Sequence, residues 1–168
     1  MPNKLYPNKM ADSVLDITAE FLTKKGIKGI IFDIDNTLAA HTEETAPQNI
    51  KQYLDNLKKS GIKTAIVSNN KKERVKKFCD GLTDIYVYRA YKPFKKHLKR
   101  VQSSFMLNPD EICLVGDQIF TDIFGGNRIG FYTVLVTALG ENETGFVAFK
   151  RLFEKAVMHK YKKEKEKL

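Results

Sequence analysis

The sequence predicts an α/β fold of three layers, in which a central parallel sheet of about five strands lies between helices on both faces. Apolar runs alternate along the chain with segments of helical periodicity, which is typical of consecutive β–α–β units. The runs are almost continuously apolar, as expected for parallel strands that are buried on both sides. With 168 residues, 42% of them hydrophobic, the chain is long enough for one domain with a substantial core.

Five runs rich in aliphatic and aromatic residues are expected to form the strands. They cover residues 27–34, 62–68, 85–88, 112–116 and 132–137. The first run ends in two aspartates, Asp33 and Asp35, at the mouth of an otherwise apolar strand. An unpaired carboxylate is costly to bury, so we expect a compensating cation at that point.

Two helices are predicted between the chain start and the second strand. The first begins at Asp12 and Ser13, which can cap it, and ends at Gly26. The second begins at Pro47, in the first-turn position where a missing N–H costs nothing, and ends at Gly61.

Three further helices follow later in the chain. A short basic helix is expected over residues 71–80, another from Pro93 to about residue 105, and a last one from Glu143 to about residue 160. The last helix has apolar residues on one face: Phe146, Phe149, Leu152, Phe153 and Val157.

The composition excludes several classes of protein. No apolar run approaches the ~18 residues of a transmembrane helix, and residues 1–7 contain no apolar segment typical of a signal peptide. The two cysteines, Cys79 and Cys113, are too few for a disulfide framework. We therefore expect one domain over residues 1–168, in the cytoplasm and able to lie peripherally on a membrane, with a basic tail at 161–168 that can fray.

The net charge of +9 favours anionic partners. Basic residues concentrate at 71–74, 95–100 and 161–167, where solvated helix faces and a frayed end are the simpler explanation. An anionic membrane surface and nucleic acid both stay open as partners, and the oligomeric state is not predicted.

Polar residues with chemical potential follow four of the predicted strands. The residues concerned are Asp33 and Asp35 after the first strand, Ser68 and Asn69 after the second, Lys92 after the third, and Asp117 and Asp122 after the fourth. In a parallel sheet the carboxyl ends of the strands meet at one edge, where ligands bind. The sequence therefore predicts one site at this edge.

This order of motifs resembles the haloacid dehalogenase superfamily, in particular its magnesium-dependent phosphatases. The resemblance covers residues 27–137 and consists of four motifs. They are Asp-x-Asp-x-Thr at Asp33, Asp35 and Thr37, a hydroxyl at Ser68, a lysine at Lys92, and a Gly-Asp pair followed by a second aspartate at Asp117 and Asp122.

The resemblance implies a role for each motif. Asp33 is implied as the nucleophile that forms an aspartyl-phosphate, and Asp35 as the general acid and base. Phosphate binding is implied for Thr37, Ser68, Asn69 and Lys92. A Mg²⁺ ion is implied as cofactor, held by Asp33, the Asp35 backbone carbonyl and Asp117, with Asp122 in support.

Each motif also has a simpler explanation. The sequence from Asp35 to Thr37 can form an ordinary turn, Ser68 can cap the helix that follows it, and Lys92 can be a solvated charge. Asp117 and Asp122 can favour the positive end of a helix that starts near residue 119. All four coincidences at matching strand ends are improbable together.

The gaps between the motifs hold no cap domain. Only residues 39–46 separate the first motif from the helix at Pro47, and residues 69–91 have room for one helix and one strand. An open site suits a bulky substrate. Residues 116–130 resemble the subclass IIIA branch related to phosphatidylglycerophosphate phosphatases, which implies dephosphorylation of a lipid headgroup at a bilayer.

The sequence leaves two alternative roles for each of three residues near the motif of Asp117 and Asp122. Phe120 or Phe124, if exposed, could enter the membrane interface, whereas core packing is the alternative. Arg128 could bind a second phosphate or pair with an acid.

Other functions stay open at the level of sequence. The same site and charge could serve a nucleic-acid end phosphatase or a phosphatase of small metabolites such as sugar phosphates and nucleotides. A receiver-like phosphoacceptor domain or a binding module without catalysis is the alternative from outside enzymology. A receiver places its phosphorylated aspartate on a middle strand after an earlier acidic pair, and here the Asp-x-Asp-x-Thr motif comes first.

Overall fold

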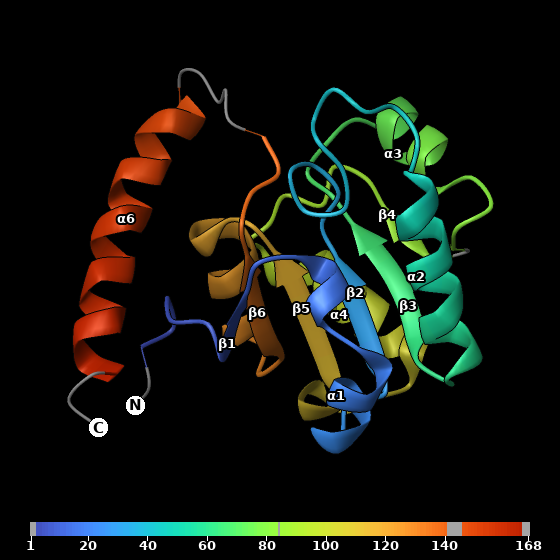
Figure 1. Cartoon of the computed structure of the whole chain (residues 1–168), viewed down its shortest axis with the longest axis horizontal. Coiled ribbons are helices and arrows are strands. Elements are labelled where there is room, and N and C mark those ends of the chain that lie inside the picture. The colour runs from blue at the N-terminus through green and yellow to red at the C-terminus, as the bar shows by residue number, and fades with distance from the viewer. Residues whose placement is uncertain (1–2, 84, 141–145, 166–168) are drawn as a thin grey trace.

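A computed structural model describes residues 3–83, 85–140 and 146–165 of the chain, and only the backbone of residues 146–153, 162 and 165 (Figure 1). Its elements, in chain order, are β1 (Lys9–Ala11), η1 (Val14–Asp16), α1 (Ala19–Lys24), β2 (Gly29–Phe32), α2 (Gln48–Lys59), β3 (Lys63–Val67), α3 (Lys72–Cys79), β4 (Tyr86–Val87), α4 (Lys95–Phe105), η2 (Pro109–Glu111), β5 (Ile112–Gly116), η3 (Ile119–Ile123), α5 (Phe124–Asn127), β6 (Tyr132–Val136) and α6 (Phe146–Lys165). The predicted α/β fold class is confirmed.

The sheet has six strands in the order β1-β6-β5-β2-β3-β4, and every pair is parallel. The five predicted strands are present, and β1 is the addition. β1 has three residues and no apolar run, so its sequence carries no strand signal. It forms because its backbone pairs with the edge strand β6, where Lys9 aligns with Val134.

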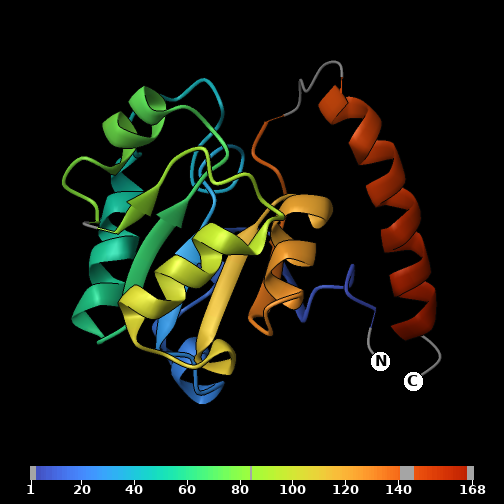
Figure 2. The ribbon, with the colours of Figure 1, turned by 180° about the vertical axis from the view of Figure 1, so that it is seen from behind.

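Helices cover both faces of the sheet (Figures 1 and 2). On one face, α1, α2 and α3 bury apolar side chains such as Leu22, Leu54 and Phe78. On the other face, α4 buries Leu98 and Phe105 against the sheet. The last helix, α6, stands beyond the β1 edge and covers neither face (Figures 1 and 2).

The predicted first helix over residues 12–26 is wrong in one respect, because the structure divides it. Ser13 caps η1 by accepting a hydrogen bond from the N–H of Leu15, and Thr18 caps α1 by accepting from the N–H of Phe21. Ile17, between them, has φ −96° and ψ 80°, outside the helical region. Two N-caps five residues apart start two short helices where the apolar spacing predicts one.

The other helices lie close to their predicted ranges. The helix predicted from Pro93 begins two residues later, at Lys95. The last helix runs to Lys165, and its predicted start at Glu143 lies outside the described residues. The side chains of its predicted apolar face also lie there, except for the half-buried Val157.

Among the described residues, neither gap between the motifs holds a cap domain, in agreement with the prediction. Residues 39–46 form a loop, and α3 and β4 lie between Ser68 and Lys92. None of the described helices has the length and apolar character needed to cross a membrane.

Candidate active site

The strand ends bring the predicted residues to one edge of the sheet. Asp33 follows β2, which pairs in register with β3 on one side and β5 on the other, so that Ser68 and Asp117 lie beside it. A cavity of about 380 Å³ opens at this edge. Its lining residues are Asp33, Asp35, Ser68, Asn69, Asn70, Lys71, Lys92, Gln118 and Thr121.

Lys92 links two of the predicted acids. Its Nζ donates to Oδ1 of Asp33 at 2.8 Å and to Oδ1 of Asp122 at 2.6 Å. The side chain of Lys92 is 2% exposed, and those of Asp33 and Asp122 are 10% and 0% exposed. Lys92 is therefore a buried, paired charge and not the solvated lysine of the simpler explanation.

Burial and neighbouring charges shift the pKa of Asp33 and that of Lys92. Burial raises the pKa of Asp33 to about 7, which the Lys92 ammonium opposes and the carboxylates of Asp122 and Asp117 reinforce. Burial lowers the pKa of Lys92, but the charges of Asp122 and Asp33 outweigh burial, and the pKa rises. Lys92 thus stays charged at neutral pH.

The acidic residues have the chemistry of a divalent metal site. Asp33, Asp117 and Asp122 are all buried, and each offers a carboxylate oxygen within 4.8 Å of the others. Within the described parts of the chain, Lys92 is the only Lys or Arg within 4.0 Å of the Asp33 or Asp122 carboxylate. Three acids facing one ammonium leave an excess of negative charge, and hard oxygen donors suit a cation such as Mg²⁺. The residues present therefore fit the implied metal.

Gly116 makes room for Asp122. A Cβ placed on Gly116 would overlap the Asp122 side chain at its Cβ, its Cγ and a carboxylate oxygen. Asp122 sits in the π-helical turn η3, and its Oδ2 also accepts from the backbone N–H of Gln118 at 3.2 Å and from the Thr121 hydroxyl at 3.3 Å. Glycine before Asp117 is thus a packing requirement of the second aspartate.

Thr37 contacts an acid of the site. Its hydroxyl donates to Oδ1 of Asp117 at 3.1 Å, and both residues are buried. Thr37 is not among the described residues that line the cavity. Its contact in the structure thus orients the Asp117 carboxylate.

Asp35 lies at the mouth of the cavity and is held by residues of α3 and its approach. Its Oδ2 accepts from Nδ2 of Asn70 at 2.9 Å. Its Oδ1 accepts from Nη2 and Nε of Arg74 at 3.0 and 3.3 Å, and Nδ1 of His41 lies 3.3 Å from the same oxygen. These contacts fix the direction of the Asp35 carboxylate, whose side chain is 19% exposed.

Arg74 was not predicted as a site residue. Its side chain is 15% exposed, its guanidinium carbon lies 5.3 Å from the Phe78 ring centroid, and its Nη1 is buried without a hydrogen-bond partner among the described residues. The sequence gives little indication of its role, because a basic run such as residues 71–74 usually forms a solvated helix face. The other members of the run are exposed. The place of Arg74 in the first turn of the helix after Ser68 is the one indication that it faces the site.

Ser68 and Asn69 connect two of the motif segments. The Ser68 hydroxyl accepts from the backbone N–H of Asn70 at 3.1 Å, and Ser68 is 1% exposed. The Asn69 side chain accepts from the backbone N–H of Lys92 at 2.6 Å and donates to the Lys92 carbonyl at 3.1 Å. Asn69 therefore fixes the backbone that carries the lysine.

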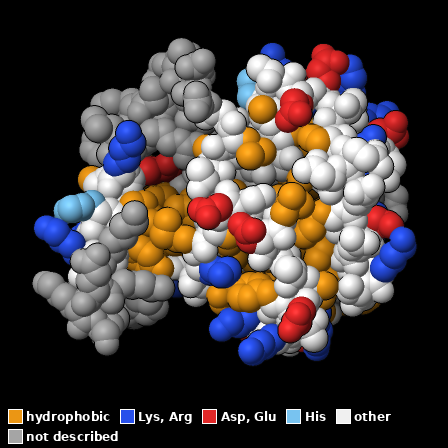
Figure 3. Space-filling view, in the orientation of Figure 1, with side chains coloured by type: hydrophobic (Ala, Val, Ile, Leu, Met, Phe, Trp, Pro, Cys, Tyr) orange, Lys and Arg blue, Asp and Glu red, His pale blue; other side chains and the backbone are white. Residues whose placement is uncertain are grey.

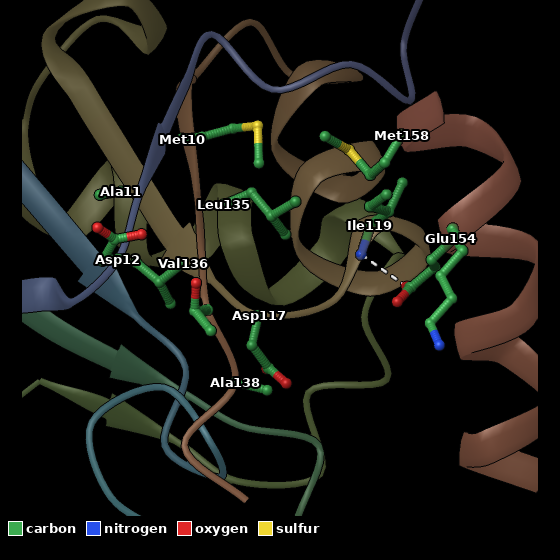
Figure 4. Close-up of a pocket in the computed structure, with 12 residues that line it drawn as sticks. Met10, Ala11, Asp12, Asp117, Ile119, Leu135, Val136, Ala138, Glu154 and Met158 are labelled. Carbon is green, nitrogen blue, oxygen red and sulfur yellow. Dashed lines mark hydrogen bonds between the residues drawn. The ribbon is translucent and has the colours of Figure 1, made fainter. Parts of the chain in front are cut away.

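A second unpredicted residue, Glu154 of α6, supports the loop after Asp117. Glu154 is 5% exposed, and its Oε1 accepts from the backbone N–H groups of Ile119 at 2.7 Å and Phe120 at 3.3 Å (Figure 4). The sequence gives little indication of it, because a single glutamate within an amphipathic helix is usually solvated.

Beside this contact lies a larger cavity of about 520 Å³ between the β1–β6 edge, η3 and α6 (Figure 4). Apolar side chains gather there in the space-filling view (Figure 3). Those that line the cavity include Met10, Ile119, Leu135 and Met158, and Asp117 closes one end. The cavity is thus lined mainly by apolar residues, with Asp12, Glu154 and Lys155 among the others, and it adjoins the acidic residues.

The residues with open roles lie on η3 (Phe120), on α5 (Phe124) and directly after α5 (Arg128). Phe120 and Phe124 are half-buried, and the guanidinium carbon of Arg128 lies 5.2 Å from the Phe124 ring centroid. None of the three is among the described residues that line the cavity of about 380 Å³ at the strand ends.

Comparison with known sequences gives close relatives. A family described as Mitochondrial PGP phosphatase matches residues 2–139. The chain is 34% identical over 158 residues to the protein named Probable phosphatase YqeG of Bacillus subtilis (strain 168), covering 94% of this chain and 92% of that protein. It is 31% identical over 153 residues to Phosphatidylglycerophosphate phosphatase 1, chloroplastic/mitochondrial, of Arabidopsis thaliana, covering 85% of this chain and 44% of that protein.

Solved structures share the fold at lower identity. An uncharacterized protein from Listeria monocytogenes serotype 4b superposes with a TM-score of 0.55 and 19% identity, covering 71% of this chain and 85% of the other. The cobalt-bound deoxy-D-mannose-octulosonate 8-phosphate phosphatase of Haemophilus influenzae superposes with a TM-score of 0.55 and 12% identity, covering 67% and 69%. Both share the overall fold of this chain.

Proposed function

Because the chain belongs to the PGP phosphatase family of the haloacid dehalogenase superfamily, and is therefore a phosphoric monoester hydrolase, we propose that it removes the terminal phosphate from phosphatidylglycerophosphate. The proposal includes Asp33 as nucleophile, Asp35 as general acid and base, and Mg²⁺ as cofactor. The observation that carries it is the buried group of three aspartates with Lys92. Asp35 is held nearby, at the mouth of the cavity.

In the first step, an Oδ of Asp33 forms a bond to phosphorus while the bond from phosphorus to the ester oxygen breaks. The leaving oxygen takes a proton from Asp35, whose carboxyl group is aimed by Asn70 and Arg74. In the second step, Asp35 takes a proton from water, whose oxygen attacks the phosphorus of the Asp33 phosphate. The bond to Asp33 breaks, and inorganic phosphate leaves.

Lys92 and Ser68 are proposed to bind oxygens of the transferring phosphate, with Asn69 holding the lysine's backbone in place. Mg²⁺, held by Asp33, Asp117 and Asp122 and by the Asp35 backbone carbonyl, would supply the positive charge that lets a carboxylate approach a phosphate dianion. Thr37 would orient Asp117 through the contact at 3.1 Å.

The lipid substrate rests on three supports. The Arabidopsis relative is named for phosphatidylglycerophosphate, the cavity opens at a sheet edge without a cap domain, and the chain carries a net charge of +9. A peripheral position on an anionic membrane would suit such a substrate.

The substrate proposal is tested by comparing kcat/KM for phosphatidylglycerophosphate in mixed micelles, 5′-phosphorylated oligonucleotides, nucleoside monophosphates and sugar phosphates. We expect the lipid to be the best substrate by at least about tenfold, because the Arabidopsis relative is named for this lipid. A higher kcat/KM for the oligonucleotide, falling steeply with salt, would assign the site to nucleic-acid ends instead.

Mg²⁺ is expected to raise the melting temperature of the protein by about 5–10 °C at a hundredfold excess over its dissociation constant. The reason is that the ion offsets repulsion among three buried acids. Asp117→Asn should lose most of this rise, whereas Asp110→Asn, which changes an exposed acid in η2, should keep it. An equal rise in both variants would place the ion elsewhere.

A further inference from the structure

Three exposed aromatic residues stand within the seven consecutive residues 88–94, which include Lys92. Seven large hydrophobic residues are exposed in the described parts of the chain, and three of them lie within residues 88–94. Tyr88, Tyr91 and Phe94 are 37%, 61% and 68% exposed. Isolated exposed apolar residues need no explanation, but a cluster next to a site does.

The backbone of this segment is tied to the cavity. The N–H of Arg89 donates to the Asn70 carbonyl at 2.9 Å, and the N–H of Ala90 donates to the Ser68 carbonyl at 3.0 Å. Lys92 is tied to Asn69 by the two hydrogen bonds described above. The segment that carries the exposed aromatics is therefore tied through its backbone to residues that line the cavity.

An uncommon backbone conformation turns the aromatic and basic side chains outward. Arg89 and Tyr91 have φ of 46° and 52°, in the left-handed region that side chains other than glycine rarely adopt. Ala90 and Lys92, between and after them, are buried. Such conformations persist where the surrounding structure holds them and are concentrated at functional sites.

Exposed basic residues stand within this segment and at the start of α3. Lys71 is exposed and lines the cavity, and Nζ of the exposed Lys72 lies 5.8 Å from the Tyr88 ring centroid. Arg89 is exposed as well. Among the described residues, no carboxylate lies within 4.0 Å of these three cations, as the ion pairs of the structure involve other residues. Their charge is thus available to an anionic partner.

We propose that the surface formed by Tyr88, Tyr91, Phe94, Lys71, Lys72 and Arg89 docks the protein on an anionic phospholipid bilayer, with the cavity mouth facing the lipid. The inference deepens the proposed function and rests on it for the identity of the substrate. Aromatic rings with an apolar body suit the level of the headgroups, and the cations suit anionic lipid. Docking by this surface would present a headgroup phosphate directly to Lys92 and Asp33.

The chain contains no tryptophan, so one introduced tryptophan reports on one position. Phe94 and Met106 flank the two ends of α4 and are 68% and 83% exposed. Phe94 lies toward the carboxyl ends of the strands, and Met106 lies toward their amino ends. In the full-length protein, Phe94→Trp should show a shift of emission to shorter wavelength and quenching by brominated lipid on vesicles of equimolar phosphatidylglycerol and phosphatidylcholine. Met106→Trp, the matched control, should show neither.

A second pair of variants tests binding itself by sedimentation with the same vesicles. The double variant Tyr91→Asn, Phe94→Ser removes both rings. Asparagine tolerates the positive φ at residue 91, and serine is a preferred residue at residue 94, the N-cap of α4. We expect the double variant to weaken vesicle binding by about tenfold or more. Met106→Asn, at φ 55°, should bind as the parent does.

Several results would overturn the docking surface. They are equal responses of the two tryptophan variants, sedimentation unchanged in the double variant, or no vesicle binding by the parent protein. Preferential binding of the parent to single-stranded DNA would assign the surface to nucleic acid instead. None of these measurements uses turnover, so the docking surface can fail while phosphatase activity on phosphatidylglycerophosphate stands, and the reverse.

Discussion

Asp33→Asn is expected to lower kcat for any phosphate monoester by at least about 10³-fold, because an amide does not replace a carboxylate as nucleophile. The substitution keeps the shape of the side chain, and Lys92 keeps its ion pair with Asp122 at 2.6 Å. Loss of activity should therefore come with retention of fold. Initial rates with Mg²⁺ and a thermal melt of the same preparation measure both.

The control for this variant is Asp55→Asn, which changes an exposed acid on α2 and is purified in the same way. It should retain the parent's kcat. Undiminished turnover in carefully purified Asp33→Asn would remove Asp33 as the nucleophile, and a collapsed melting transition would show that the residue is needed for folding.

Asp35→Asn is expected to affect substrates according to their leaving group. Alkyl phosphates should lose about 10²–10⁴-fold in kcat, because their leaving oxygen needs a proton. p-Nitrophenolate leaves without one, so the first step with p-nitrophenyl phosphate should persist. The second step still lacks its base, and we expect a burst of about one equivalent of p-nitrophenol followed by slow turnover.

Stopped-flow absorbance measures the burst directly. Glu44→Gln, an exposed acid on the loop over residues 39–46, is the control and should show no burst. Equal losses for alkyl and aryl phosphates without a burst would contradict the acid and base role of Asp35. In that case Arg74 would only neutralise the Asp35 carboxylate, and Asn70 would only hold it in place.

The strands with strong apolar runs could be predicted from sequence, because burial on both faces leaves a pattern in each strand alone. β1 could not, because its three residues form a strand only by pairing with β6. The division of the first helix depends on which of several capping residues is used. Ser13 and Thr18 both cap, and the apolar spacing does not distinguish one helix from two.

The candidate site follows the same division between local and distant information. Asp33, Lys92, Asp117 and Asp122 each follow a predicted strand, so the topology alone brings them together. The environment of Asp35 was not predictable in the same way, because it depends on how α3 packs and on which side of that helix Arg74 lies. The sequence leaves Phe120 and Phe124 open between the membrane interface and the core, and the structure has both half-buried. The structure instead exposes Tyr91 and Phe94, in a segment where Arg89 and Tyr91 have positive φ.

The contact of Glu154 with the backbone N–H groups of Ile119 and Phe120 connects α6 to the loop that follows Asp117. The family match ends at residue 139, before α6 begins. The helix nevertheless supplies the acceptor for two backbone donors that directly follow Asp117 and Gln118. A displacement of α6 would leave these donors without this acceptor and would remove a support of the turn that carries Asp122. Control of this phosphatase could thus be exerted from outside the segment that defines its family.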